Sequence, residues 1–239
     1  MSRADLITAH ASQTFDDGPS GFLLSVAAEG FSHIDQLVLG KGDLTATTVT
    51  GGSAAVLARV GGGVRLTDAS ATNTASHLHS GKVLDAAKKF AVEVKLQKTL
   101  VSSSDGGVFV GVVGGTLGAA VPIAGNAGSH GAAASSIGFL IKDSDGDAAI
   151  PTNRDGSGAA VEHTGVAISA ATDVRLGILY NPDDDVKVRY YVDGDLVAQD
   201  SDNCPASGTA LQFTVSAKAS GNSNPNTSDI DYLAFASKV

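Results

Sequence analysis

Residues 174–199 have the pattern of three consecutive β-strands joined by tight turns. Within residues 174–180, Val174, Leu176, Ile178 and Tyr180 alternate with Arg175, Gly177 and Leu179, and residues 186–190 alternate apolar with basic side chains. This is the two-residue period of a strand. Between them, residues 181–185 (Asn-Pro-Asp-Asp-Asp) favour a turn. The dipeptide Asp193-Gly194 suits a two-residue hairpin, because glycine tolerates positive φ. The stretch predicts an antiparallel meander, which any fold for this chain must contain.

Similar strand signals recur along the rest of the chain. Residues 90–96 alternate apolar and charged side chains and predict one buried and one solvated face, whereas residues 108–113 are apolar throughout, as in a strand buried on both faces. Glycine pairs and triplets within residues 44–66 favour short strands, because glycine destabilises a helix by about 1 kcal/mol relative to alanine. Shorter apolar runs predict strands at 22–26, 34–39, 137–142, 211–217 and 230–235.

The remaining segments predict connections. Residues 67–82 and 143–162 are polar, and residues 114–136 are rich in Gly, Ala and Ser. Residues 83–89 fit either one helical turn or the start of the strand at 90–96. Long connections often carry function, so the excursions at 114–136 and 143–162 are candidate contact segments.

The length of 239 residues is one that all-β sandwiches reach as a single unit. No repeat or linker divides residues 21–239, so we expect one domain there. Residues 1–20 fit either an N-terminal arm or a first edge strand. The single cysteine, Cys204, excludes an intrachain disulfide.

The composition argues against several classes of function. A net charge of −9 and a pI of about 4.9 disfavour nucleic acid, whose affinity comes largely from basic side chains. No stretch approaches the ~20 apolar residues of a membrane span, and the N-terminus lacks the apolar core of a signal peptide. We therefore expect no membrane contact and synthesis in the cytoplasm. The aromatic residues are Phe 8 and Tyr 4 with no Trp, which leaves little surface for stacking sugar rings.

The strand order of the C-terminal half resembles concanavalin A-like lectin/glucanase domains. The residues that carry the resemblance are the YVDG hairpin at 191–194, the strand LQFTVSA at 211–217 and DYLAF at 231–235, with 90–97 and 108–113 matching preceding strands. It covers roughly residues 85 to 236 and rests on structural motifs. It implies an all-β, two-sheet antiparallel jelly roll.

Short, Gly/Ala-rich members of this group without catalytic carboxylates resemble jelly-roll structural proteins of tailed bacteriophages. That resemblance implies a non-enzymatic virion protein, a capsid decoration or cement protein. Such a protein would be a homo-oligomer that binds the major capsid protein, or another virion protein, through its loops and N-terminal arm. The alternative is a carbohydrate-binding module, free or on a phage fibre.

The glycosidase motif of the superfamily is missing. Those enzymes place two glutamates around an aspartate on one strand face, but the only glutamates here are Glu29, Glu93 and Glu162, far apart in sequence. We therefore predict no catalytic residue. Cys204 also has no nucleophile signature around it.

The acidic run Asp143, Asp145 and Asp147 has oxygen ligands at alternate positions and is a candidate Ca²⁺ site. An EF-hand would need glycine at Ala148 and an acidic residue at Arg154, so that motif fails. A solvated acidic turn is the competing interpretation, and it applies equally to the acidic residues at 183–185, 193 and 195.

Two further groups are candidates for ligand contact. His77 and His79 would share one strand face, a spacing usable for metal, although the polar composition around them favours an exposed loop. Tyr180 and Tyr191 are candidate glycan contacts. Adjacent Tyr190 and Tyr191 must point to opposite faces of a strand, so at least one of them belongs to the core.

Overall fold

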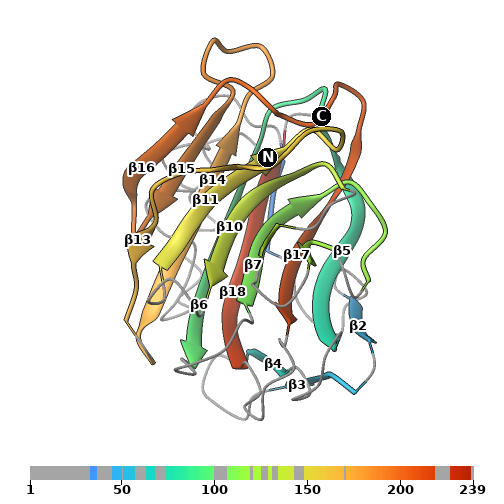
Figure 1. The fold of residues 1–239 in the computed structure, drawn as a ribbon, viewed down its shortest axis with the longest axis vertical. Coiled ribbons are helices and arrows are strands. Elements are labelled where there is room, and N and C mark those ends of the chain that lie inside the picture. Colours follow the sequence, from blue (N-terminus) through green and yellow to red (C-terminus); the bar gives the residue numbers. More distant parts are fainter. Residues whose placement is uncertain are drawn as a thin grey trace, which may run out of the picture.

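The protein is a sandwich of two antiparallel β-sheets (Figure 1). Every regular element among the described residues is a β-strand. No helix in these parts of the chain is long and apolar enough to cross a bilayer. The computed structural model describes residues 33–36, 45–49, 51–56, 63–67, 74–99, 107–118, 121–124, 129–130, 134–142, 148–169, 171–218 and 227–237.

Sheet 1 contains the predicted meander at one edge. Its strands follow the order β16-β15-β14-β6-β18-β4-β3, and β1 also pairs with β18. Their bounds are β16 Asp195–Asp200, β15 Val188–Val192, β14 Asp173–Tyr180, β6 Phe90–Thr99, β18 Thr227–Ser237, β4 Val64–Thr67, β3 Ser53–Val56 and β1 His33–Gln36.

Sheet 2 packs against sheet 1 and follows the order β12-β11-β10-β7-β17-β5-β2, with β13 also pairing with β11. Two short strands, β8 (Ile123–Ala124) and β9 (Ser129–His130), pair separately. The bounds of sheet 2 are β12 Val161–Glu162, β11 Ala148–Arg154, β10 Ser136–Lys142, β7 Gly107–Val113, β17 Ala210–Lys218, β5 Ala75–Asp85, β2 Thr45–Val49 and β13 Val166–Ala167.

The meander forms as the sequence predicts. Leu176 pairs with Val192 and Tyr180 with Val188, and β16 returns along β15. Asp193 and Gly194 have φ values of 51° and 96°, the two positive angles that a tight hairpin of this twist requires. Local turn chemistry is sufficient to specify this part of sheet 1.

The core lies between the two sheets. Strands of both sheets contribute apolar side chains to it, and the fully apolar β7 is buried on both faces, as predicted. Its second face packs under a smaller apolar cluster that includes Phe109, Ile123 and Leu140. Tyr190 faces the main core with no exposed surface, while Tyr191 on the opposite face is half-buried. The prediction that one of these two tyrosines is a core residue is confirmed.

Removing the Tyr190 hydroxyl tests how strongly the two sheets are joined. This hydroxyl donates to the Thr152 carbonyl at 3.0 Å and so links β15 to β11 across the core. We expect Tyr190→Phe to lower the free energy of unfolding by about 1 kcal/mol, because a buried acceptor loses its donor. Urea unfolding measures this loss. Tyr180→Phe removes a similar bond, to the Ala86 carbonyl at 3.1 Å, and should cost about as much; unchanged midpoints in both variants would contradict the account.

Two predicted connections are wrong. β5 begins at Ala75, inside the expected loop at 67–82, and β11 and β12 occupy part of 143–162. Both β5 and β11 have a paired strand on each side, so ladder hydrogen bonds stabilise segments whose composition favours loops. Residues 86–89 form a turn between β5 and β6, and the helical alternative for this segment does not occur.

The charged face of β6 is buried, contrary to the prediction of a solvated face. Glu93 and Lys95 are only 1% and 7% exposed. The Lys95 Nζ lies 3.1 Å from an oxygen of Asp173 and 3.3 Å from an oxygen of Asp231. Opposite charges from neighbouring strands therefore accompany the buried ammonium group.

Several predictions concern residues outside the described ranges. They are the N-terminal arm or edge strand at 1–20, the strand at 22–26, and the Ca²⁺ candidates Asp143, Asp145 and Asp147. These stay predictions.

Candidate functional site

A polar cleft of about 330 Å³ lies at one end of the sandwich, and we call it the end cleft. Four connections line it, those joining β5 to β6, β11 to β12, β14 to β15, and β16 to β17. The pairing of Tyr180 with Phe90, and of Ser136 with Arg154, brings these connections to the same end of the two sheets. The lining residues are Ala86, Asp155, Tyr180, Pro182, Lys187, Ser201, Asp202, Asn203, Cys204, Pro205, Ala206 and Ser207.

Asp155 is the most firmly held carboxylate of the end cleft. It follows β11 directly, and one of its oxygens accepts the backbone N–H groups of Ser157 and Gly158, both at 2.8 Å. Its other oxygen accepts the Ser157 hydroxyl at 3.0 Å. The Gly158 and Ser157 N–H groups, and then the Ser157 hydroxyl, hold the pKa of this carboxyl below its usual value. Asp155 is therefore an ionised acceptor and is unsuited to donate a proton.

Asn203 brings an amide to the same place from the β16–β17 connection. Its backbone has a φ of 49°, a left-handed conformation that asparagine adopts more readily than most residues. A methyl group built on Gly158 would lie 3.6 Å from Asp155 Oδ1 and 3.7 Å from Asn203 Oδ1. Because residue 158 is glycine, two side-chain oxygens border a small open space.

Three hydrogen bonds hold the β16–β17 connection in place. Asp200 Oδ1 accepts the N–H groups of Ser201 at 2.7 Å and Asp202 at 2.9 Å. The buried Asn153 donates its amide to the Asp202 carbonyl at 2.6 Å. This bracing gives the Asn203 side of the cleft a fixed shape, which reduces the entropy lost when a ligand binds.

Tyr180 lies at the inner end of the cleft, but it cannot act as a sugar platform. It is 2% exposed, and its ring packs on Phe90 with ring centroids 4.8 Å apart. Burial raises the pKa of its hydroxyl to about 12. The sequence-based role of Tyr180 as a glycan contact is therefore wrong, because the ring belongs to the core. Tyr191 is half-buried and is not among the residues lining the cleft.

Cys204 contributes a neutral thiol to the lining. Burial, with a smaller effect of the nearby Asp200 carboxylate, raises the pKa of this thiol to about 11. The thiol donates to the Asp202 carbonyl at 3.4 Å. It stays protonated at neutral pH and is a poor nucleophile.

The histidine pair is not an exposed loop, contrary to the prediction. His77 and His79 lie on β5; His77 is 2% exposed and shares a hydrogen bond of 2.7 Å with Ser216, while His79 contacts Thr47 at 2.9 Å. In the described part of the chain, no group of three or more His, Cys, Asp or Glu side chains is placed to share a metal ion. Among the described residues, His77 and His79 therefore have no third ligand of these kinds beside them.

The acidic residues of two turns are at the surface. Asp184 forms an ion pair with Arg189 at 3.1 Å, and Asp183, Asp193 and Asp195 are exposed. Sequence reasoning did not single out Asp155 and Asn203. Their segments, Asp-Gly-Ser-Gly and Asp-Asn-Cys-Pro, carry clear turn signals, but their proximity depends on the pairing of distant strands.

The end cleft combines hydrogen-bonding groups of several kinds. It offers the Asp155 carboxylate, the Asn203 amide, the hydroxyls of Ser201 and Ser207, and the ammonium group of Lys187. Such a set can accept from and donate to neighbouring hydroxyl groups of one ligand. It contains no buried carboxylic acid poised as a proton donor among the described lining residues.

No protein-family model matches the chain, and no curated protein matches it. Solved structures do match. The potassium-bound carbohydrate recognition domain of Emp46p is 15% identical, with a TM-score of 0.59 over 82% of this chain and 89% of that one. A protein of unknown function from Shewanella oneidensis is 13% identical, with a TM-score of 0.61 over 86% and 85%. Peanut lectin is 14% identical, with a TM-score of 0.57 over 87% and 98%.

These similarities establish the fold. The chain has the two-sheet, legume-lectin-like architecture of the concanavalin A-like type, so the predicted fold class is confirmed. A sialidase also matches, at 12% identity and a TM-score of 0.52, but the shared part is 17% of that chain. The Emp46p domain has been solved in potassium-bound and metal-free forms.

Proposed function

We propose that this protein is a non-enzymatic carbohydrate-binding domain that takes a neutral sugar in the end cleft. The observation that carries the proposal is the convergence of the Asp155 carboxylate and the Asn203 amide above Gly158. A sugar presents adjacent hydroxyl groups that each donate and accept, and a fixed carboxylate beside an amide complements such a pair.

The solved neighbours support this proposal over a virion role. They include a carbohydrate recognition domain and a lectin, and they share the fold of this chain. A role in capsid decoration, with a capsid partner and a homo-oligomeric state, rests on analogy with phage jelly rolls alone. No contact among the described residues favours it over sugar binding.

Binding without catalysis is the form of activity that fits the cleft. Hydrolysis of a glycosidic bond needs one carboxyl group that donates a proton and a second that attacks or activates water. Asp155 is held in its ionised form by three hydrogen bonds. It can orient a sugar hydroxyl, and it is the wrong partner for protonating a leaving group.

A glycan array tests the proposal. We expect the purified protein to bind a restricted set of neutral glycans. A variant with both Asp155→Asn and Asn203→Gly should lose that binding while its unfolding midpoint stays close to that of the parent, because glycine tolerates the positive φ of residue 203. Chelator should leave binding unchanged if no metal takes part. Absence of specific binding to any glycan, or binding that survives in the double variant, would contradict the proposal.

A further inference from the structure

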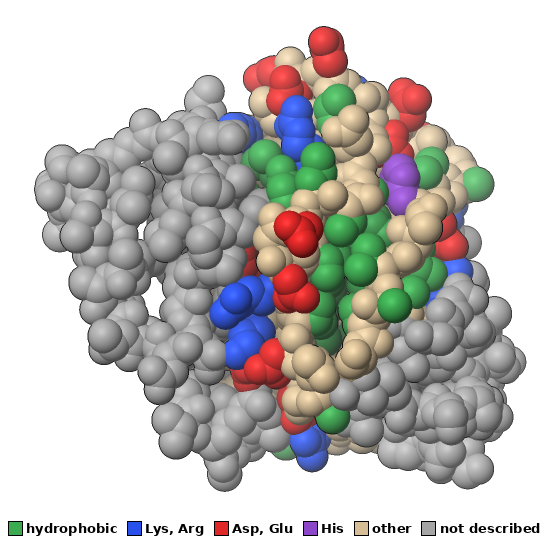
Figure 2. All heavy atoms as spheres, turned by 90° about the vertical axis from the view of Figure 1, so that its left-hand side faces the viewer, with side chains coloured by type: hydrophobic (Ala, Val, Ile, Leu, Met, Phe, Trp, Pro, Cys, Tyr) green, Lys and Arg blue, Asp and Glu red, His purple; other side chains and the backbone are tan. Residues whose placement is uncertain are grey.

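A second cleft, which we call the side cleft, opens on the flank of the sandwich. It has a volume of about 300 Å³ and lies between β13 of sheet 2 and the β15–β16 hairpin of sheet 1. Figure 2 looks at this flank and shows hydrophobic side chains gathered there beside acidic ones. The short β13 pairs with β11 at two positions only, Ala148 and Ala149. Beside it, the core residues Val174 and Val192 line the cleft.

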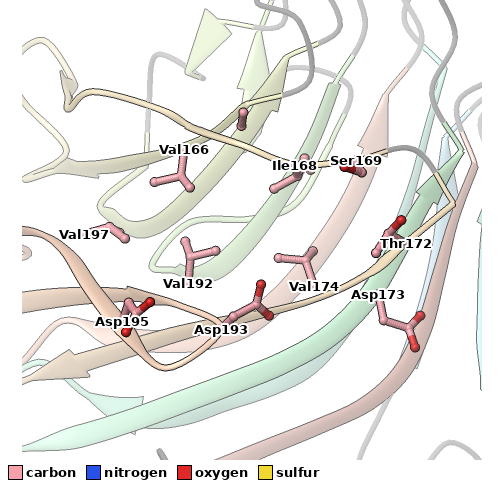
Figure 3. A pocket seen from close by; sticks show the side chains of 11 residues that line it. Val166, Ile168, Ser169, Thr172, Asp173, Val174, Val192, Asp193, Asp195 and Val197 are labelled. Carbon is pink, nitrogen blue, oxygen red and sulfur yellow. The ribbon is translucent and has the colours of Figure 1, made fainter.

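The floor of the side cleft is aliphatic. Val174 and Val192 belong to the main core and are 5% and 7% exposed, and Val166, Ile168 and Val197 are half-buried above them. Figure 3 shows these five side chains turned toward a common space. An aliphatic ligand chain of a few carbons would cover them and remove apolar surface from water.

The mouth of the side cleft carries two carboxylates on the β15–β16 turn. Asp193 is held by the backbone of Arg175. Its side-chain Oδ1 accepts the Arg175 N–H at 2.9 Å, and its own N–H donates to the Arg175 carbonyl at 2.8 Å. Asp195 follows and is exposed. Neither carboxylate has a basic side-chain partner among the described residues.

The third acidic residue of the lining differs from these two. Asp173 forms an ion pair with Lys95 at 3.1 Å, and Figure 3 shows its carboxylate turned away from the valines. The described residues that line the cleft include no Lys or Arg. The side cleft therefore combines a hydrocarbon floor with negative charge at its mouth.

We propose that the side cleft binds a small organic cation, an ammonium group on a short aliphatic chain. The chain would lie on the valines and the ammonium group would meet Asp193 and Asp195. The volume is that of a small-molecule site.

Pairing of a partner strand with β16 is disfavoured. This edge strand carries a register shift opposite Tyr190 and Tyr191, and such bulges together with edge charges block strand addition.

Titration of isotopically labelled protein with n-pentylammonium, followed by NMR, tests this proposal. We expect the resonances of Val174, Val192 and Val197 to shift together. The affinity should be about tenfold higher than for n-pentanol, which has a similar chain without the charge. Equal affinities for the two probes, or shifts confined to other parts of the protein, would overturn the proposal.

Charge-removing variants locate the cation. Asp193→Asn keeps the acceptor for the Arg175 N–H and tolerates positive φ, so it should fold. Combined with Asp195→Asn it should reduce pentylammonium affinity to that of pentanol. The double variant Asp183→Asn with Asp185→Asn, which makes the same change of charge in the exposed β14–β15 turn, is the matched control and should bind as the parent does. Retained affinity in the variant at Asp193 and Asp195, or an equal loss in the control, would contradict a specific site.

Discussion

Lowering the pH from about 7 to about 4.5 is expected to reduce the free energy of unfolding by roughly 2 to 3 kcal/mol through His77 alone. Burial lowers the pKa of His77 to about 4; the neighbouring His79 and Lys218 add smaller shifts in the same direction, and the backbone of Gly118 has an opposing effect. The side chain is 2% exposed, and its Nε2 has no hydrogen-bond partner among the residues that the structure describes. Its neutral form is therefore the one compatible with the folded state.

The sign of the effect follows from proton binding in the two states. Between about pH 6.5 and pH 4 the unfolded chain takes up a proton at this histidine and the folded protein does not. Stability from His77 is complete above the unfolded pKa and is lost as the pH falls toward the folded pKa. Below that value this group causes no further loss.

His77→Asn tests this prediction. Asparagine does not titrate and its amide can reach Ser216, which now shares a hydrogen bond with the histidine Nδ1. We expect the variant to have a lower free energy of unfolding at neutral pH and a smaller decrease of that free energy in acid, measured by urea unfolding at a series of pH values. His163→Gln, on a different strand connection, is the control and should show the same decrease caused by His77 as the parent. Parallel pH curves for His77→Asn and the parent would contradict the account.

Replacing Asp155 with asparagine is expected to weaken sugar binding by about 10- to 100-fold, the usual effect of losing a hydrogen bond to a charged group. The substitution keeps an oxygen that can accept the N–H groups of Ser157 and Gly158, so the turn should be preserved. Calorimetric titration with the glycan identified on the array measures the loss. An unchanged affinity would place the sugar elsewhere.

Asp183→Asn provides the matched comparison for this experiment. Asp183 lies in the neighbouring β14–β15 connection, is exposed, and is not among the residues lining the end cleft. Its replacement makes the same change in net charge and should leave affinity unchanged. Similar losses in both variants would indicate a general electrostatic effect, which salt would screen.

The fold could be predicted where local sequence determines structure. The Asp193-Gly194 turn and the alternating strands on either side of it define the meander without help from the rest of the chain. The apolar run at 108–113 likewise identifies β7 as a strand buried on both faces. In these segments the local sequence preference and the tertiary structure favour the same conformation, so the conformation can be predicted from the sequence.

Prediction failed where tertiary pairing overrides composition. β5 contains two histidines, two serines and a lysine, and reads as a loop, yet β2 and β17 pair with it on both sides. The burial of Lys95 depends on carboxylates supplied by other strands, Asp173 and Asp231. Such compensation cannot be seen in the segment itself.

The candidate site was less predictable than the fold. Asp155 and Asn203 are far apart in sequence and come together only because the ends of β11 and β16 lie at the same end of the sandwich. Tyr180 is a candidate glycan contact by residue type, as a tyrosine that could form a sugar platform, but the alternation that defines β14 also directs it into the core. Whether a residue near the cleft can contact a ligand or belongs to the core depends on the direction of its side chain, which the residue type alone does not give.

Mapping of the bound sugar by NMR shows whether the sugar occupies the end cleft. We expect titration of the labelled protein with its glycan to shift the resonances of Gly158, Asn203 and Ser207 together, and these shifts to disappear in Asp155→Asn at the same glycan concentration. Shifts that cluster away from the end cleft, or no shifts with any glycan retained on the array, would contradict sugar binding at this site.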